Sequence, residues 1–316
     1  MKRIAKTAMP DWRKKELISL CQNMGNWFGH RAVGDLNGDL QERYANERCR
    51  YVIRKIDGER RVIRTNEHAP IAAYRDLKIL AAAINRFLKR KVGGVQMRFS
   101  PVLPDPPEDR ERWLTRSEAA RLLWAAWRAR QRSSNPEKPG RYTSKHIARY
   151  ILVGLYTGSR NGDICGASLL PSINRGHVDL QRGSFKRKPD AKRETSKRQP
   201  TVPIPPRLLA HMRRWQRLGI SRNAVIEFDG KPITRVRDGW ETVVELAGLA
   251  TDDPKRKVVR HTLRHTAISW YLAAGVDIEL VSQYCGVSVA TIRKVYRHSM
   301  PGTFSPVLGA ANRFGR

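Results

Sequence analysis

Apolar positions at helical spacing dominate the first hundred residues. They recur three and four positions apart around 11–23, 36–54 and 68–90, a period typical of amphipathic helices. The stretch IAAYRDLKILAAAINRFLKR, at 71–90, shows the pattern most clearly. This part of the chain predicts a small, basic, mainly helical domain over residues 1–103.

The helical pattern breaks at LPDPPEDRERW, residues 103–113, where three prolines and a run of charges stand together. This composition is typical of a linker, because proline cannot continue a helix and charges stay solvated. A chain of 316 residues is also long enough for two domains. We therefore expect a linker over 104–113 and a second domain over 114–316.

Beyond the linker, the pattern predicts helices interrupted by a few short strands. Thr115 and Glu118 have the spacing of a capping box, which starts a helix, and a second helix over about 144–156 stops at TGSR. HVDL, SFKRK and TVPI show the alternation of strands, whereas PPRLLAHMRRWQRL, TRVRDGWETVVELAGL and three segments within 261–298 return to helix. The prediction is a mainly α fold: a helical N-terminal domain and a mostly helical second domain with a small three-stranded antiparallel sheet.

The charge balance points to an acidic polymer as partner. Lys and Arg number 61 against 29 Asp and Glu, a formal net charge of +32. Such an excess is typical of nucleic-acid binding, because neutralised phosphates release counterions. A membrane is disfavoured, since the longest apolar run, YILVGLY, is too short to span one. With no signal-peptide pattern and four scattered cysteines, we expect a cytoplasmic, nucleoid-associated protein with reduced thiols.

The most unusual local pattern is HTLRH at 261–265, which opens an otherwise apolar helix. His261, Arg264 and His265 fall within one arc of that helix, and buried cations there favour an anion such as phosphate. Two other interpretations remain open from the pentapeptide alone. The histidines could bind a metal, although no third ligand lies nearby and we predict none, or the segment could be an ordinary capped helix start.

A second candidate for anion binding is Arg160, the last residue of TGSR. It stands at the entrance to a helix, where its guanidinium and the free backbone N–H groups of residues 161–163 could share one anion. Taken alone, an arginine in a turn is more often a solvated side chain.

Taken together and in order, these motifs resemble the tyrosine recombinase (phage integrase) family. The resemblance rests on Arg in TGxR, a lysine in a β-hairpin, HxLRH, and Tyr296 in TIRKVYRH, and it covers roughly 113–300. It implies a helical catalytic domain with a small sheet, preceded by a core-binding domain that closes a C-shaped clamp around duplex DNA.

The resemblance also implies a role for each matching residue. Arg160 and Arg264 would clamp the scissile phosphate, His261 would donate to a phosphate oxygen, and Tyr296 would be the nucleophile. Asp163 would support the arginine and His265 would support the site without reacting. The chemistry is consistent without a cofactor, because two guanidiniums and an imidazole match the charge that develops on the phosphate.

The catalytic lysine is expected in the hairpin FKRKPDAKRETSKRQPTVPIP, shortly before the last strand. Lys197 is nearest to the family's position, and Lys192 and Lys188 remain alternatives because Ser196 stands where a first lysine is expected. The other cations of this loop predict contacts with DNA. The predicted DNA-binding residues are Lys186, Arg187, Lys188, Arg193 and Arg198.

One position departs from the family pattern. Val287, nine residues before Tyr296, stands where most members carry a histidine or tryptophan that contacts the phosphate. Loss of one such donor costs about 10- to 1000-fold in rate, so an inactive relative stays an alternative. The same stretch also resembles a helix-turn-helix with Asp277 and Ser288 as caps, which would make the protein a noncatalytic DNA-binding regulator. A type IB topoisomerase is a third alternative.

The favoured interpretation is a site-specific recombinase or integrase of a phage or mobile element that works through a 3′-phosphotyrosine intermediate. Its expected partners are double-stranded DNA, three further copies of itself in a homotetramer on synapsed DNA, and an accessory DNA-bending protein. The resemblance further implies that each protomer passes its C-terminal tail, residues 299–316, to a neighbour.

Overall fold

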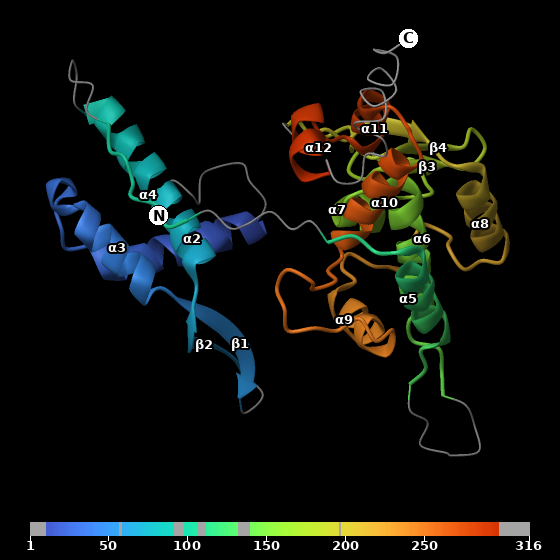
Figure 1. Ribbon diagram of the computed structural model, residues 1–316, viewed down its shortest axis with the longest axis horizontal. Helices are drawn as coiled ribbons and strands as arrows, with labels where there is room; N and C mark the ends of the chain where they lie inside the picture. The colour runs from blue at the N-terminus through green and yellow to red at the C-terminus, as the bar shows by residue number, and fades with distance from the viewer. Residues whose placement is uncertain are drawn as a thin grey trace, which may run out of the picture. The chain divides into compact units, whose positions relative to one another are not determined.

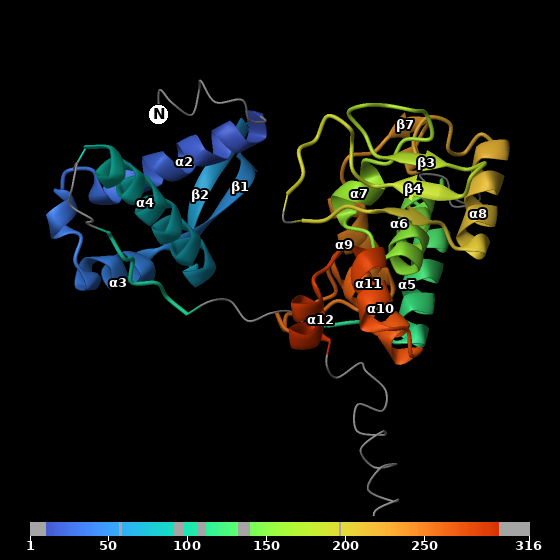
Figure 2. The same ribbon diagram turned by 90° about the horizontal axis from the view of Figure 1, so that it is seen from above.

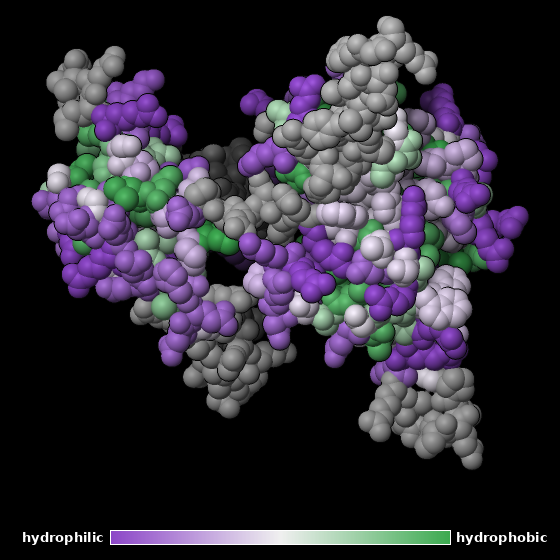
Figure 3. Space-filling view, in the orientation of Figure 1, coloured by the Kyte–Doolittle hydropathy of each residue, from purple (hydrophilic) through white to green (hydrophobic). Residues whose placement is uncertain are grey.

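The computed structural model describes residues 11–56, 59–91, 98–105, 112–131, 140–195 and 197–296. The chain divides into two compact units, Met1–Glu108 and Asp109–Arg316. Figure 1 shows the helices and strands of both units, and Figure 3 shows that hydrophilic residues cover much of the same face. No helix in the described part of the chain is long and apolar enough to cross a membrane.

The first unit is a set of helices packed around one apolar core, with a two-stranded ribbon attached. Its core joins residues of three helices, among them Leu20, Phe28, Tyr44 and Leu77. Apolar residues at helical spacing bring these side chains to one face of each helix. The elements are α2 (Asp11–Phe28), η1 (Val33–Asp35), α3 (Gly38–Glu47), β1 (Cys49–Ile56), β2 (Glu59–His68) and α4 (Pro70–Lys91).

The ribbon corrects the helix that the sequence pattern predicted over 36–54. Helix α3 ends at Glu47, and Cys49–Ile56 is instead a strand that pairs with Glu59–His68. Val52 and Ile53 are β-branched and are paired in register with Ile63 and Val62, and β-branched residues favour strands over helices. The Asp-Gly pair at 57–58 is a hairpin signal in the sequence that the helical interpretation overlooked.

The helices of the second unit follow the predicted pattern. The capping box is confirmed: Thr115 Oγ1 accepts from the Glu118 N–H, and Glu118 Oε2 accepts from the Thr115 N–H. Helix α6 is buried along most of its length and forms the centre of the unit. The helices are α5 (Arg116–Arg128), α6 (Lys145–Thr157), α7 (Asn161–Cys165), α8 (Pro206–Arg217), α9 (Arg237–Leu246), α10 (Thr262–Ala273), α11 (Ile278–Cys285) and α12 (Val289–Val295).

The predicted three-stranded antiparallel sheet is present, in the order β3-β4-β5. Phe185, at its centre, is fully buried against Val178 and Val202 and anchors the sheet to the core of the unit. A further short hairpin, which the sequence pattern did not predict, follows α8. The strands are β3 (His177–Asp179), β4 (Ser184–Lys186), β5 (Thr201–Pro203), β6 (Glu227–Phe228) and β7 (Lys231–Pro232).

The last three helices enclose a second apolar cluster of this unit. Ile268, Val281, Ile292 and Tyr296 are buried in it. Asp277 caps α11 and Ser288 caps α12, as predicted from the sequence. The C-terminal end of α12 is thereby packed on the helix that begins with HTLRH.

Candidate active site

Arg160 lies at the start of α7, after a sharp turn. Helix α6 ends at Thr157, and its C-cap residue Gly158 has a left-handed φ of +59°. A Cβ on Gly158 would lie 2.9 Å from Cys285 Sγ. A glycine therefore allows the end of α6 to approach the end of α11. Arg160 Nη1 donates to the carbonyl oxygen of Arg198 at 2.8 Å, and Nη2 donates to that of Gly286 at 2.8 Å.

Arg264 reaches the same loop from helix α10. Its side chain is buried, and Nη1 donates to the carbonyl oxygens of Gly158 at 2.8 Å and Cys285 at 2.6 Å. Its Nη2 donates to the Gly286 carbonyl oxygen at 3.2 Å. Burial, together with the nearby charge of Arg160, lowers the pKa of Arg264 to about 10, which leaves it charged at neutral pH.

The two arginines therefore converge on one oxygen, although 104 positions separate them in the chain. Two like charges repel each other and need negative charge or oriented dipoles close by. Backbone carbonyls supply the dipoles here. A phosphate oxygen would supply a full negative charge at the same place, with bidentate geometry that suits guanidinium groups.

Tyr296 lies at the C-terminal end of α12 and is buried against α10 and α11. It is 4% exposed, and its hydroxyl lies 2.8 Å from Nδ1 of His265, with ring centroids 5.3 Å apart. Burial raises the pKa of Tyr296 above its usual value, while the charge of Arg264 opposes that shift. The phenol is therefore neutral at physiological pH and has one nitrogen in position to exchange a proton with it.

His261 extends the same row of rings toward the surface. It is the exposed N-cap residue of α10, its side chain makes no capping hydrogen bond, and its ring centroid lies 4.9 Å from that of His265. The row therefore runs His261, His265, Tyr296. The sequence predicts a supporting role for His265. Its direct contact with Tyr296 is visible only in the fold.

Asp163 is connected to the hairpin by a short chain of hydrogen bonds. Its buried carboxylate accepts from Gln199 Nε2 at 2.5 Å, and Gln199 Oε1 accepts from Lys192 Nζ at 2.5 Å. The other carboxylate oxygen, Oδ2, is buried without a hydrogen-bond partner. Asp163 thus ties the helix that follows Arg160 to the basic loop. The sequence analysis missed Gln199, because nothing in its local pattern marks a contact 36 residues away.

The other candidate lysines differ in how they are held. Lys197 is exposed, and its backbone N–H donates to Thr195 Oγ1 at 3.3 Å. Lys188 Nζ donates to Glu194 at 2.6 Å, and Lys186 pairs with Asp190. The predicted DNA-binding residues Arg193 and Arg198 are exposed on the same loop.

Arg187, predicted from the sequence to bind DNA with the other cations of the loop, is buried instead. It is 2% exposed, and its guanidinium donates to the carbonyl oxygens of Tyr284 at 2.5 Å and Thr157 at 2.8 Å. The strand β4 ends one residue before it, and alternation along the strand turns this position inward. Arg187 therefore joins α6, α11 and the sheet behind the two converging arginines, where it cannot reach DNA on the surface.

Val287 supplies no side-chain hydrogen-bond donor at the position where the family usually has one. It is half-buried, packs against the cluster that contains Tyr296, and its carbonyl oxygen accepts from Ser282 Oγ at 2.6 Å. Among the described residues, no three of His, Cys, Asp and Glu lie close enough together to hold a metal ion.

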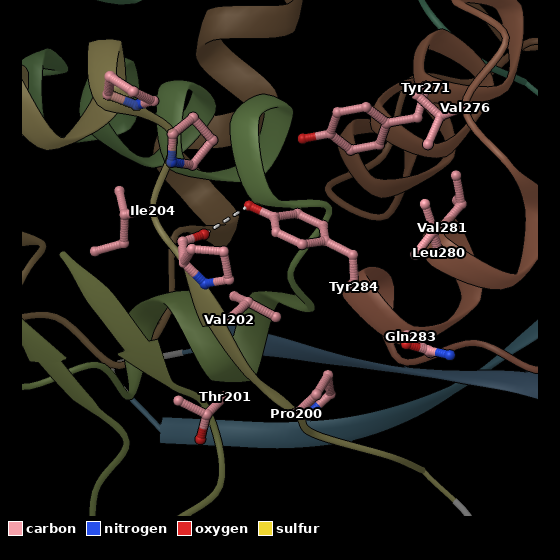
Figure 4. A pocket seen from close by; sticks show the side chains of 13 residues that line it. Pro200, Thr201, Val202, Ile204, Tyr271, Val276, Leu280, Val281, Gln283 and Tyr284 are labelled. Carbon is pink, nitrogen blue, oxygen red and sulfur yellow. Dashed lines mark hydrogen bonds between the residues drawn. The ribbon is translucent and has the colours of Figure 1, made fainter.

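One pocket of this unit is apolar, and neither Arg160 nor Arg264 lines it. It has a volume of about 720 Å³ and lies between the segment Pro200–Pro206 and helices α10 and α11. Figure 4 shows Tyr271, Tyr284 and Val202 around it, with the hydroxyl of Tyr284 on the carbonyl oxygen of Pro203 at 3.1 Å. No charged side chain lines the pocket, so it is unsuited to phosphate.

A comparison with known families shows the family to which the chain belongs. The profile of the phage integrase family matches residues 112–302, more than half of the chain. The chain belongs to the phage integrase family. The match contains Arg160, Arg264 and Tyr296, so these residues lie within the family's own domain.

Solved structures of integrases have the same fold as this member of the family. The Tn1549 transposon integrase in complex with transposon right end DNA is 14% identical, covering 100% of this chain and 98% of that one, with a TM-score of 0.64. A lambda integrase(75–356) dimer bound to a COC′ core site is 13% identical, covering 96% and 94%, with a TM-score of 0.62. No curated protein matches this integrase-family chain.

Proposed function

We propose that this protein is a site-specific DNA recombinase that cuts and rejoins DNA through a 3′-phosphotyrosine intermediate on Tyr296. The observation that carries the proposal is the convergence of Arg160 and Arg264 on the Gly286 carbonyl oxygen. Tyr296 lies at the end of α12, within the electrostatic reach of Arg264.

In this mechanism the two guanidiniums bind the scissile phosphate. A phosphate oxygen replaces the Gly286 carbonyl oxygen as their shared acceptor, and His261 donates from the exposed side of the row. Attack adds negative charge to the nonbridging oxygens, and preorganised cationic donors stabilise that charge more than they stabilise the ground state.

The cleavage step balances with residues of this chain. Tyr296 Oη forms a bond to phosphorus while the bond from phosphorus to the 5′ oxygen breaks. The phenolic proton passes to His265 Nδ1, which lies 2.8 Å away, and the leaving 5′ oxygen receives a proton from a hairpin lysine. The phosphotyrosine bond keeps the energy of the phosphodiester, so attack by a second 5′ hydroxyl rejoins DNA without a further energy source.

The proposed partner is double-stranded DNA, bound by the excess of positive charge. We further propose a homotetramer on two synapsed sites with the help of an accessory DNA-bending protein, as part of a phage or another mobile element. A lambda integrase tetramer bound to a Holliday junction, which this chain matches with a TM-score of 0.56, supports the assembly as a family arrangement. The tail at 299–316 lies outside the described residues.

A covalent-trapping experiment tests the proposal. Wild type and Tyr296→Phe are incubated with DNA that flanks the gene and compared on a denaturing gel. Tyr284→Phe is the matched control, because it also removes a hydroxyl, one that is hydrogen-bonded to a backbone carbonyl in this unit. We expect an adduct with wild type and Tyr284→Phe and none with Tyr296→Phe.

Two outcomes would contradict the proposal. An adduct that survives in Tyr296→Phe means that another residue is the nucleophile. Tight, sequence-specific DNA binding without any adduct means a regulator of the helix-turn-helix kind or a relative disabled at Val287.

A further inference from the structure

The β1–β2 ribbon of the first unit has no role in the proposed reaction. Its strands, Cys49–Ile56 and Glu59–His68, pair with each other, and within the described residues neither packs extensively on a helix. Figure 1 shows the ribbon extending beyond the helices of its own unit, and Figure 2 shows the same ribbon from above. A two-stranded ribbon alone is only marginally stable in water, so these strands contribute little to the stability of the unit and are candidates for a binding role.

The base of the ribbon is fixed firmly to the helices. Arg48, at the end of α3, donates from Nε to Asp76 Oδ2 at 2.8 Å, and the buried Tyr44 donates to the same oxygen at 2.8 Å. Where the second strand ends, His68 bonds to the Ala45 carbonyl oxygen at 2.9 Å. At the base of the ribbon, the start of β1 and the end of β2 are thus both fixed to the helices α3 and α4.

The register of the ribbon places cations opposite cations. Arg54 is paired with Arg61, and Lys55 is paired with Arg60. Among the paired positions that the structure describes, none sets a cation opposite a carboxylate. Like charges at opposite register positions destabilise a strand pair, and an external anion would offset that cost. The two strands carry six Lys and Arg against two Glu.

We propose that the β1–β2 ribbon is a DNA-binding arm that lies along a groove of the duplex and contacts its phosphates. A first strand of eight residues spans roughly 26 Å, and neighbouring strands lie about 4.8 Å apart, whereas the major groove is about 12 Å wide. The inference rests on the proposed function for its partner, duplex DNA.

The salt dependence of binding tests the ribbon. The double variant Arg54→Gln/Arg61→Gln removes one opposed pair from the full chain, and Arg214→Gln/Arg217→Gln removes two exposed cations from α8 as the matched control. Removing one phosphate contact reduces the slope of log affinity against log salt by about 0.9, so the slope of the ribbon variant should be shallower by about 2. The control should keep the wild-type slope.

A second readout separates DNA binding from structural damage. Removing like charges that face each other should leave the thermal transition unchanged or raise it, while DNA binding weakens. An unchanged salt slope, or an equal decrease in the control pair, overturns the proposal. A failure of the proposed function is distinct from this, because wild type would then form no covalent adduct whatever the ribbon contributes to binding.

Discussion

At the scale of single residues, Gly286 is constrained both by its backbone conformation and by the hydrogen bonds that its carbonyl oxygen accepts. Its φ of +64° is left-handed, and a Cβ would lie 2.6 Å from the Arg198 carbonyl oxygen and 2.8 Å from Pro200 Cδ. Its own carbonyl oxygen holds both arginines. A side chain at this position would therefore disturb the backbone, the loop before β5 and the phosphate site together.

We expect Gly286→Ala to lower the free energy of unfolding by about 2–4 kcal/mol, the sum of strain in a left-handed residue and the clash. Gly275→Ala is the control, because its φ is +78° but nothing lies within 4 Å of its added Cβ. That variant should lose only about 1–2 kcal/mol in the same urea titration. Equal losses in the two variants would show that the approach to Arg198 and Pro200 is unimportant.

His265 tests whether the contact with Tyr296 serves chemistry. We expect His265→Gln to slow adduct formation in single-turnover assays by about 100-fold or more, the usual contribution of a positioned proton acceptor. His211→Gln, on the exposed side of α8, should leave the rate unchanged. If His265→Gln cleaves DNA at the wild-type rate, the phenolic proton leaves by another route.

At the scale of elements, the proposed reaction assigns the proton for the leaving oxygen to a lysine of the loop between β4 and β5. Lys192 donates to Gln199, which in turn bonds to Asp163, but Lys192 and Lys197 are both exposed, so burial does not distinguish them. Lys192→Ala, Lys197→Ala and Lys188→Ala should be compared on a normal substrate and on one with a 5′-phosphorothiolate. A thiolate leaves without a proton, so the new substrate should restore cleavage only for the variant that lacks the proton donor. If the 5′-phosphorothiolate substrate restores cleavage for none of the three variants, the proton donor lies outside this loop.

The start of α5 offers a test of stability against pH. Burial raises the pKa of Glu118, but hydrogen bonds from Arg112 and from the Thr115 N–H outweigh burial and lower it overall. Because the pKa is lower in the folded state, this stabilisation is present above the unfolded value of about 4.3 and is lost as the pH falls through the folded value.

We expect Glu118→Gln to cost about 1 kcal/mol at pH 7, because it removes the charge that pairs with Arg112, while the amide oxygen can still accept from the Thr115 N–H. The difference from wild type should shrink as the pH falls from about 5 to about 3, because the wild-type carboxylate is then protonated. Urea titrations at several pH values measure this, with Glu241→Gln, an exposed carboxylate on α9, as control. A difference that is independent of pH would contradict a role for the charge.

At the scale of the whole molecule, the excess of positive charge governs DNA affinity. A protein that contacts 6–10 phosphates loses about 10³- to 10⁵-fold in affinity between 50 and 200 mM salt. With a net charge of +32, we expect a decrease within this range on nonspecific duplex DNA, measured by fluorescence anisotropy. An affinity that hardly changes with salt would mean that most of these cations face away from DNA.

The sequence by itself determined the helices of the second unit, the capping box of Thr115 and Glu118 and the caps Asp277 and Ser288, because each depends on residues within a turn or two of one another. Only the tertiary structure decided which side chains meet. The burial of Arg187 and the chain from Lys192 to Asp163 both join residues that are distant in sequence. So does the contact of Tyr296 with His265, 31 residues apart. Local patterns carry no information on such contacts, because their energy arises only when the packed fold brings the partners together.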